Sequence, residues 1–124
     1  MSTILIVEDN PKNLKLVRDL LQAKGYATLE SERAEEGLEL ARTQLPALIL
    51  MDIGLPRMSG IEALGALRAD PATAGIPVIA ITASVMQDNR REIEAAGFDG
   101  FVEKPINVRG FLETVRAALA TAPR

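Results

Sequence analysis

Acidic residues and one lysine occur in this sequence where apolar segments end. Glu8 and Asp9 directly follow one apolar run, and Asp52 follows a second. Thr82 follows a third, and Lys104 comes shortly after a fourth. Carboxylates beside a lysine and a hydroxyl can bind a divalent cation or transfer a phosphoryl group, provided that the fold brings them together.

The apolar runs alternate with amphipathic segments, which predicts strands alternating with helices. The expected strands are residues 3–7, 26–30, 47–51, 77–81 and 99–102. The expected helices are residues 11–24, 32–45, 61–69, 86–96 and 108–119. Five such repeats are typical of the α/β class, here a doubly wound (βα)5 fold with a parallel five-stranded sheet and helices on both faces.

Local signals support these elements. Asn10 followed by Pro11 is a typical helix start, and Asn107 is expected to cap the last helix. Ser31 is expected to cap the second helix in the same way. Gly37 lies inside that helix, where glycine is unfavourable by about 1 kcal/mol relative to Ala, so close packing is expected there.

The carboxyl ends of parallel strands lie at one edge of the sheet, so Glu8, Asp9 and Asp52 should converge there with Thr82 and Lys104. Two carboxylates about 4 Å apart repel by roughly 4 kcal/mol at an effective dielectric constant of about 20. Lys104 can offset part of this repulsion. The chain has no His and no Cys, and an oxygen-only ligand set favours Mg²⁺ or Mn²⁺. The expected chemistry is phosphoryl transfer with a carboxylate as the nucleophile.

Composition limits the other functions. The 124 residues are 48% hydrophobic and fit a single domain, 1–124. A net charge of −3 argues against nucleic-acid binding. No apolar run is long enough for membrane insertion, and the N-terminus lacks a signal-peptide pattern, so a cytoplasmic location is expected.

These residues, in their order along the chain, resemble the receiver domain of two-component response regulators. The matching positions are Glu8-Asp9, Asp52 with Pro56 and Gly60 behind it, Thr82-Ala83 and Lys104-Pro105. The resemblance covers essentially the whole chain, and the opening ILIVEDNPKNLKLV is most similar to single-domain regulators of the DivK type. It implies a sheet with strand order 2-1-3-4-5, as in flavodoxin-like folds.

The resemblance also implies a role for each residue of the group. Asp52 would be phosphorylated, and Lys104 would pair with the phosphoryl group. Asp9, Asp52 and the backbone carbonyl of Gly54 would bind Mg²⁺ directly. Glu8 would act on the metal through a bound water.

Two further positions would form a switch. Thr82 would hydrogen-bond the phosphoryl group in the active state, and Phe101 would turn inward with it. The Lys104–Pro105 bond is usually cis in this family. Two positions depart from the commonest pattern, because Glu8 stands where Asp is frequent and Phe101 where Tyr is frequent.

As a receiver, the chain would catalyse its own phosphorylation and dephosphorylation rather than act as a conventional enzyme. Because it has no histidine, the phosphohistidine donor would be a separate histidine kinase or histidine phosphotransfer protein. The output would be a protein contact through the fourth helix, the fifth strand and the fifth helix.

Three alternatives remain open at this point. The chain could be a receiver module from a larger hybrid kinase. An aspartyl-phosphate phosphatase of the haloacid-dehalogenase type would need a second Asp two residues after Asp52, where this sequence has Gly54. A flavodoxin-like cofactor binder would need a phosphate-binding first loop, but the segment 8–11 carries Glu8 and Asp9, which would repel phosphate.

Overall fold

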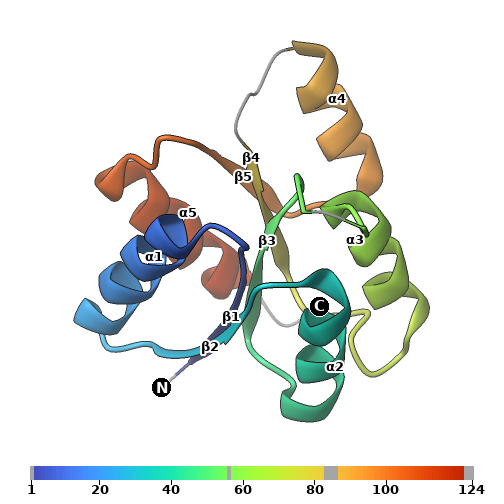
Figure 1. Ribbon diagram of the computed structural model, residues 1–124, viewed down its shortest axis with the longest axis horizontal. Helices are drawn as coiled ribbons and strands as arrows, with labels where there is room; N and C mark the ends of the chain where they lie inside the picture. The colour runs from blue at the N-terminus through green and yellow to red at the C-terminus, as the bar shows by residue number, and fades with distance from the viewer. Residues whose placement is uncertain (1, 56, 83–86, 122–124) are drawn as a thin grey trace.

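The computed structural model describes residues 2–55, 57–82 and 87–121. Within them, five parallel strands form one sheet in the order β2-β1-β3-β4-β5, which confirms the expected topology (Figure 1). The strands are β1 (Thr3–Val7), β2 (Ala27–Ser31), β3 (Leu48–Asp52), β4 (Val78–Thr82) and β5 (Gly100–Glu103). β1 and β3 lie inside the sheet, so the two acidic strand ends are neighbours.

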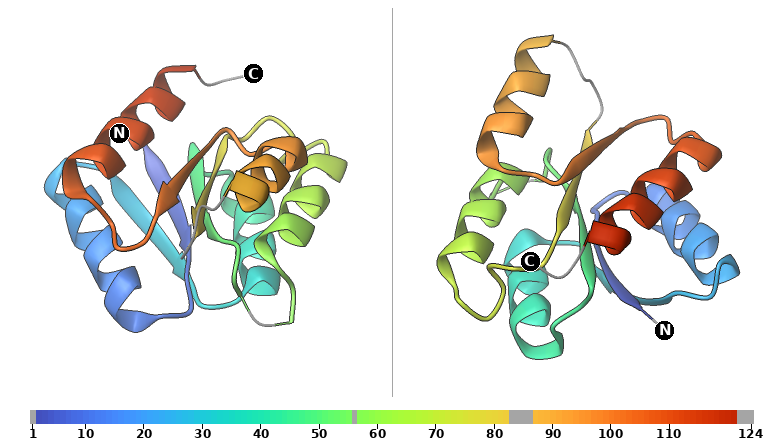
Figure 2. Two further views of the ribbon diagram at one scale, coloured as in Figure 1. Left: turned by 90° about the horizontal axis from the view of Figure 1, so that it is seen from above. Right: turned by 180° about the vertical axis from the view of Figure 1, so that it is seen from behind.

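Helices cover both faces of the sheet. The pair α1 (Pro11–Ala23) and α5 (Val108–Thr121) lies on one face. The other face carries α2 (Ala34–Gln44), α3 (Gly60–Ala69) and α4 (Gln87–Ala96) (Figures 1 and 2). This arrangement is the doubly wound architecture that the alternation of strands and helices predicts.

Each face has its own apolar core. Ile4 and Ile6 of β1 point toward the α1–α5 side, whereas Leu5 and Val7 point toward the α2–α3 side. Successive residues of a strand point to opposite faces, so a strand covered on both sides must be apolar throughout. Residues 48–52 of β3 are all buried, which explains the continuous apolar run before Asp52.

Four strands end one residue later than their apolar runs predict. β3 includes Asp52, which pairs with Ile81, and β4 includes Thr82, which pairs with Glu103. The backbone ladder continues through these residues because pairing depends on backbone groups, whereas hydropathy reports only the side chains. The side chains of Asp52 and Thr82 therefore lie in the last ladder positions rather than after them.

Two of the three expected helix caps are confirmed. The side-chain oxygen of Asn10 accepts hydrogen bonds from the backbone N–H groups of Lys12 and Asn13, at 2.9 and 3.3 Å. Asn107 accepts one from the N–H of Gly110 at 2.8 Å. Both caps fix the first turn of a helix that begins at the acidic edge of the sheet.

The expected cap at Ser31 is wrong. Ser31 is the last residue of β2, and α2 begins at Ala34, preceded by Arg33 in an extended conformation. The Ser31 hydroxyl instead donates to the carbonyl of Arg33 at 2.7 Å. A serine commonly bonds the backbone two residues on, and this local turn competes with its use as a cap.

Gly37 is packed closely, as expected. A Cβ atom at this position would lie 2.7 Å from Cγ2 of Val7, which is shorter than van der Waals contact allows. The glycine therefore lets α2 approach β1 directly beside the strand end that carries Glu8.

No helix of the described residues is long and apolar enough to cross a membrane. Pro56 of the Gly/Pro turn, Ala83 and Ser84 after the fourth strand, and Met86 at the expected start of the fourth helix lie outside the described residues.

Candidate functional site

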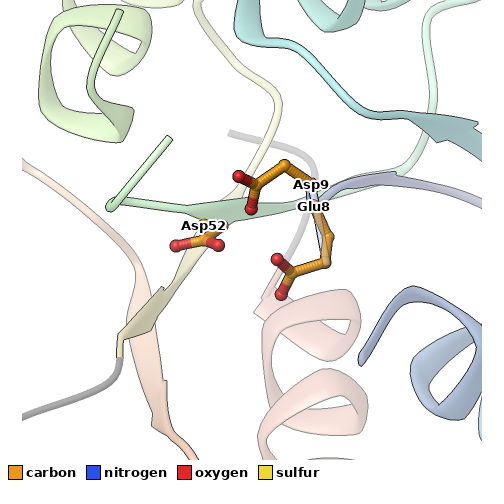
Figure 3. Close-up of side chains that lie close together, drawn as sticks. All are labelled: Glu8, Asp9 and Asp52. Carbon is orange, nitrogen blue, oxygen red and sulfur yellow. The ribbon is translucent and has the colours of Figure 1, made fainter. Parts of the chain in front are cut away.

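Three carboxylates meet at the carboxyl edge of the sheet (Figure 3). Glu8 and Asp9 follow the end of β1, and Asp52 is the last residue of the neighbouring strand β3. One carboxylate oxygen from each lies within 4.8 Å of the other two. The convergence expected from the strand ends is therefore present in the structure.

Lys104 reaches this group from the segment that follows β5. Its Nζ lies 2.9 Å from Oε1 of Glu8 and 3.1 Å from Oδ2 of Asp52. Its backbone N–H donates to the carbonyl of Thr82 at 2.8 Å, which extends the β4–β5 pairing to the lysine. The Lys104–Pro105 bond is cis, as the resemblance implies.

Glu8 is completely buried. Burial, followed by the adjacent carboxylate of Asp52, raises its pKa from 4.5 to about 7, although Lys104 and the backbone N–H of Asn10 act in the opposite direction. That N–H donates to Oε2 of Glu8 at 3.1 Å. The site therefore holds a carboxyl that is partly protonated near neutral pH.

The pKa of Lys104 is raised as well. Partial burial lowers the pKa of Lys104, but the adjacent carboxylates of Glu8 and Asp52 outweigh this effect, so the net pKa is raised. Lys104 therefore stays a cation between the two carboxylates across the physiological range.

The turn after β3 shapes the site around Asp52. The N–H of Gly54 donates to Oδ1 of Asp52 at 2.8 Å, which fixes the orientation of the carboxylate. The turn requires glycine at position 60, because a Cβ there would lie 2.6 Å from Cα of Ile53. The close approach of the two backbone segments explains why glycine occurs at this position.

An open hollow of about 470 Å³ lies over the site. Five predicted site residues line it: Asp9, Asp52, Gly54, Thr82 and Lys104. Its other lining residues are Asn10, Ile53, Ile61, Glu92 and Ile93. No sequence motif marks Ile61, Glu92 or Ile93 as site residues, because they reach the hollow only through the packing of α3 and α4.

Phe101 lies apart from this hollow. It pairs with Ala80 across β4 and β5 and is partly buried. It lines a second hollow with Pro105, Phe111 and Thr114, between β5 and α5. The structure therefore brings together every predicted site residue except Phe101.

The cluster of three carboxylates is suited to a hard divalent cation. Oε1 of Glu8 is buried and accepts no hydrogen bond within the described residues, although Lys104 lies beside it as an ion partner. A buried acceptor without a hydrogen bond is unfavourable unless a charge or ligand satisfies it. Three converging carboxylates form the oxygen-rich donor set that Mg²⁺ prefers.

Comparison with known proteins agrees with this geometry. The family model of the response regulator receiver domain matches residues 4–116. The polar-differentiation response regulator DivK of Brucella anthropi is 44% identical over 97% of this chain and 98% of its own length.

Solved structures of the same kind superpose closely. A CheY-like receiver domain protein from Methanospirillum hungatei has a TM-score of 0.87 and 31% identity, covering 97% of this chain and 94% of its own. The receiver domain of a sensor histidine kinase from Pseudomonas aeruginosa has a TM-score of 0.89 and 28% identity, covering 97% and 98%. That structure contains a magnesium ion coordinated in the active-site cleft. On its sequence, its fold and the geometry of its acidic site, the chain belongs to the response regulator receiver domain family.

Proposed function

We propose that this chain is a phosphorylated switch in which Asp52 accepts a phosphoryl group from a phosphohistidine. The observation that carries the proposal is the position of Lys104 Nζ, 3.1 Å from Asp52 and 2.9 Å from Glu8. One carboxylate oxygen of Asp9 lies within 4.8 Å of an oxygen of each of these two residues. The donor would be a histidine kinase or a histidine phosphotransfer protein, because this chain has no histidine.

In the transfer, a carboxylate oxygen of Asp52 attacks phosphorus and forms an acyl phosphate. The P–N bond of the donor breaks, and the imidazole nitrogen keeps the electron pair. Gly54 N–H holds Asp52 in place through its 2.8 Å hydrogen bond. Lys104 offsets the negative charge of the phosphoryl group, and Thr82 on the hollow wall donates a hydrogen bond to it.

The metal site would use the same edge of the sheet. Asp9, Asp52 and the carbonyl of Gly54 would hold Mg²⁺, with Mn²⁺ as an alternative, and Glu8 would act through a bound water. The cation supplies positive charge that offsets the phosphoryl oxygens. The magnesium ion in the receiver domain from Pseudomonas aeruginosa supports this assignment.

The output would be a change in protein contacts. Thr82 ends β4, so its hydrogen bond to the phosphoryl group would displace the segment that leads to α4. Phe101 on β5 would follow by packing, because a phenyl ring has no hydroxyl to bond. The downstream partner would then read the surface of α4, β5 and α5.

We also propose that residues 1–124 act as one receiver domain with a stand-alone role. The 44% identity to the response regulator DivK supports this role. The cytoplasmic location stays a prediction from the sequence.

Phosphoryl uptake in vitro tests the assignment of Asp52. The purified protein is incubated with Mg²⁺ and a small acyl-phosphate donor, and its intact mass is measured over time. We expect the parent to gain the mass of one phosphoryl group and Asp52→Asn to gain none. Asp19→Asn on the exposed side of α1 is the matched control and should behave as the parent. Uptake by Asp52→Asn at the parent rate would refute the assignment.

A further inference from the structure

Helix α4 supplies one wall of the hollow above Asp52, through Glu92 and Ile93. Ile93 is 1% exposed, so its side chain anchors this part of the helix in the interior. Glu92 is exposed and lines the same hollow as Asp52, Thr82 and Lys104. An acidic residue of α4 therefore borders the hollow in which a phosphoryl group on Asp52 would lie.

Glu92 makes no ion pair with any residue that the structure describes. Among the described residues that line the hollow, Lys104 is the single cationic side chain. Lys104 is already shared between Glu8 and Asp52. The field of Glu92 therefore extends into the hollow, where charges act more strongly than on an open surface.

We propose that Glu92 is a charge-tuning residue of this site, which disfavours the phosphoryl dianion and favours the divalent cation. The inference rests on the proposed function, since it concerns the phosphoryl group on Asp52. It assigns to Glu92 two effects of opposite sign, because one negative charge repels an anion and attracts a cation in the same hollow.

The position of Glu92 on α4 gives this charge a regulatory consequence. If Glu92 at the hollow disfavours the phosphoryl group, then the phosphoryl group disfavours that placement of α4 by the same factor. Phosphorylation thus pushes on α4 through charge repulsion, in addition to any pull through Thr82. A partner that holds α4 away from the hollow will in turn favour phosphorylation.

Neutralising the residue tests the effect on the anion. The rate of phosphoryl uptake from a small acyl-phosphate donor is measured at saturating Mg²⁺ for the parent, Glu92→Gln, Glu92→Lys and Glu94→Gln. Glu94 is an exposed carboxylate on the same helix that does not line the hollow, so it controls for the net charge of α4. We expect Glu92→Gln to be roughly threefold to tenfold faster than the parent, Glu92→Lys to be faster still, and Glu94→Gln to match the parent. The ratio of Glu92→Gln to parent should shrink as ionic strength rises.

Metal binding without a donor tests the effect on the cation. We expect Mg²⁺ to bind Glu92→Gln more weakly than the parent by about twofold to fivefold, and Glu92→Lys more weakly again. Faster uptake with weaker metal binding supports charge tuning, because a merely structural role would move both in the same direction. Slower uptake, or rates equal to the parent in a parent that does accept the phosphoryl group, would overturn the inference. Failure of the parent itself to accept the group would instead refute the proposed function.

Discussion

The electrostatics of the site depend strongly on Glu8. It is fully buried beside Asp52, and Lys104 is its nearest cation at 2.9 Å. In the absence of metal, burial and then the adjacent carboxylate of Asp52 raise the pKa of Glu8 to about 7. The site is therefore poised near neutral pH to exchange a proton for a cation.

The raised pKa of Glu8 predicts a pH dependence of stability in chelator. Its folded pKa of about 7 exceeds the ordinary value of 4.5, so its stabilising contribution is complete at low pH and is lost as pH rises through 7. The shift limits the loss to roughly 3 kcal/mol. Urea unfolding of the parent and Glu8→Gln from about pH 5 to about pH 8 isolates this contribution. The parent should lose stability relative to Glu8→Gln across that range, and a constant difference would contradict the burial of an ionising Glu8.

Removing the lysine should have a large effect on the metal-free protein. Lys104→Ala leaves Glu8 and Asp52 without their cation, and breaking a buried pair from one side costs roughly 3 kcal/mol. Denaturant unfolding in chelator at pH 8 measures the change. Lys15→Ala is the matched control, because Lys15 pairs with Asp19 on the exposed surface of α1 and should contribute less than about 1 kcal/mol. Equal effects of the two variants would show that Lys104 does not hold the carboxylates together.

At this scale the sequence predicts which residues meet but not how they meet. Glu8, Asp9 and Asp52 could be placed together because parallel strands end at one edge of the sheet. The burial of Glu8 and its oxygen without a hydrogen bond depend on neighbours that are distant in sequence. Glu92 could not be assigned to the site, since its position depends on how α4 packs.

At the scale of the elements, Gly37 sets the distance between α2 and β1. A Cβ at this position would lie 2.7 Å from Cγ2 of Val7, so Gly37→Ala must displace the strand end or the helix. We expect a loss of about 1–3 kcal/mol, although Ala is the better helix former. Gly65→Ala in α3 is the control, because a Cβ there meets nothing within 4 Å, and it should stabilise by up to about 1 kcal/mol.

A second variant distinguishes the contact from other causes. Val7→Ala removes the methyl groups that a Cβ at position 37 would meet. Added to Gly37→Ala, it should therefore recover part of the lost unfolding free energy, as measured by a double-mutant cycle in urea. Additive losses would contradict the close contact between α2 and β1.

Element bounds were predicted to within a few residues, and the errors have physical causes. Hydropathy ends the strands one residue before Asp52 and Thr82, because these side chains are polar although their backbones still pair in the sheet. The residue type of Ser31 permits a cap, but its hydroxyl donates to the carbonyl of Arg33 within a local turn. The glycine at 37 was interpreted correctly because a helix-breaking residue inside a helix needs a packing reason.

For the whole molecule, a metal site at the three clustered carboxylates implies that metal binding and folding are coupled. A ligand that binds the native state alone at ten times its Kd adds about 1.4 kcal/mol to the stability. We expect millimolar Mg²⁺ to raise the unfolding midpoint of the parent above its value in chelator. Asp9→Asn should lose this increment and, with one carboxylate fewer, should be at least as stable as the parent in chelator. An unchanged parent midpoint on adding Mg²⁺ at low ionic strength would contradict the metal site.

The central claim is that the edge of the sheet at β1, β3 and β5 makes Asp52 the phosphoryl acceptor. The most direct measurement locates the phosphoryl group in the parent protein after incubation with Mg²⁺ and a small acyl-phosphate donor. Reduction by borohydride converts an aspartyl phosphate to homoserine, and peptide mapping then reads the modified position. We expect conversion at Asp52 alone, with Asp9 and Glu8 unmodified. Conversion at another carboxylate, or a stable phosphoryl mass with no reduced aspartate, would contradict it.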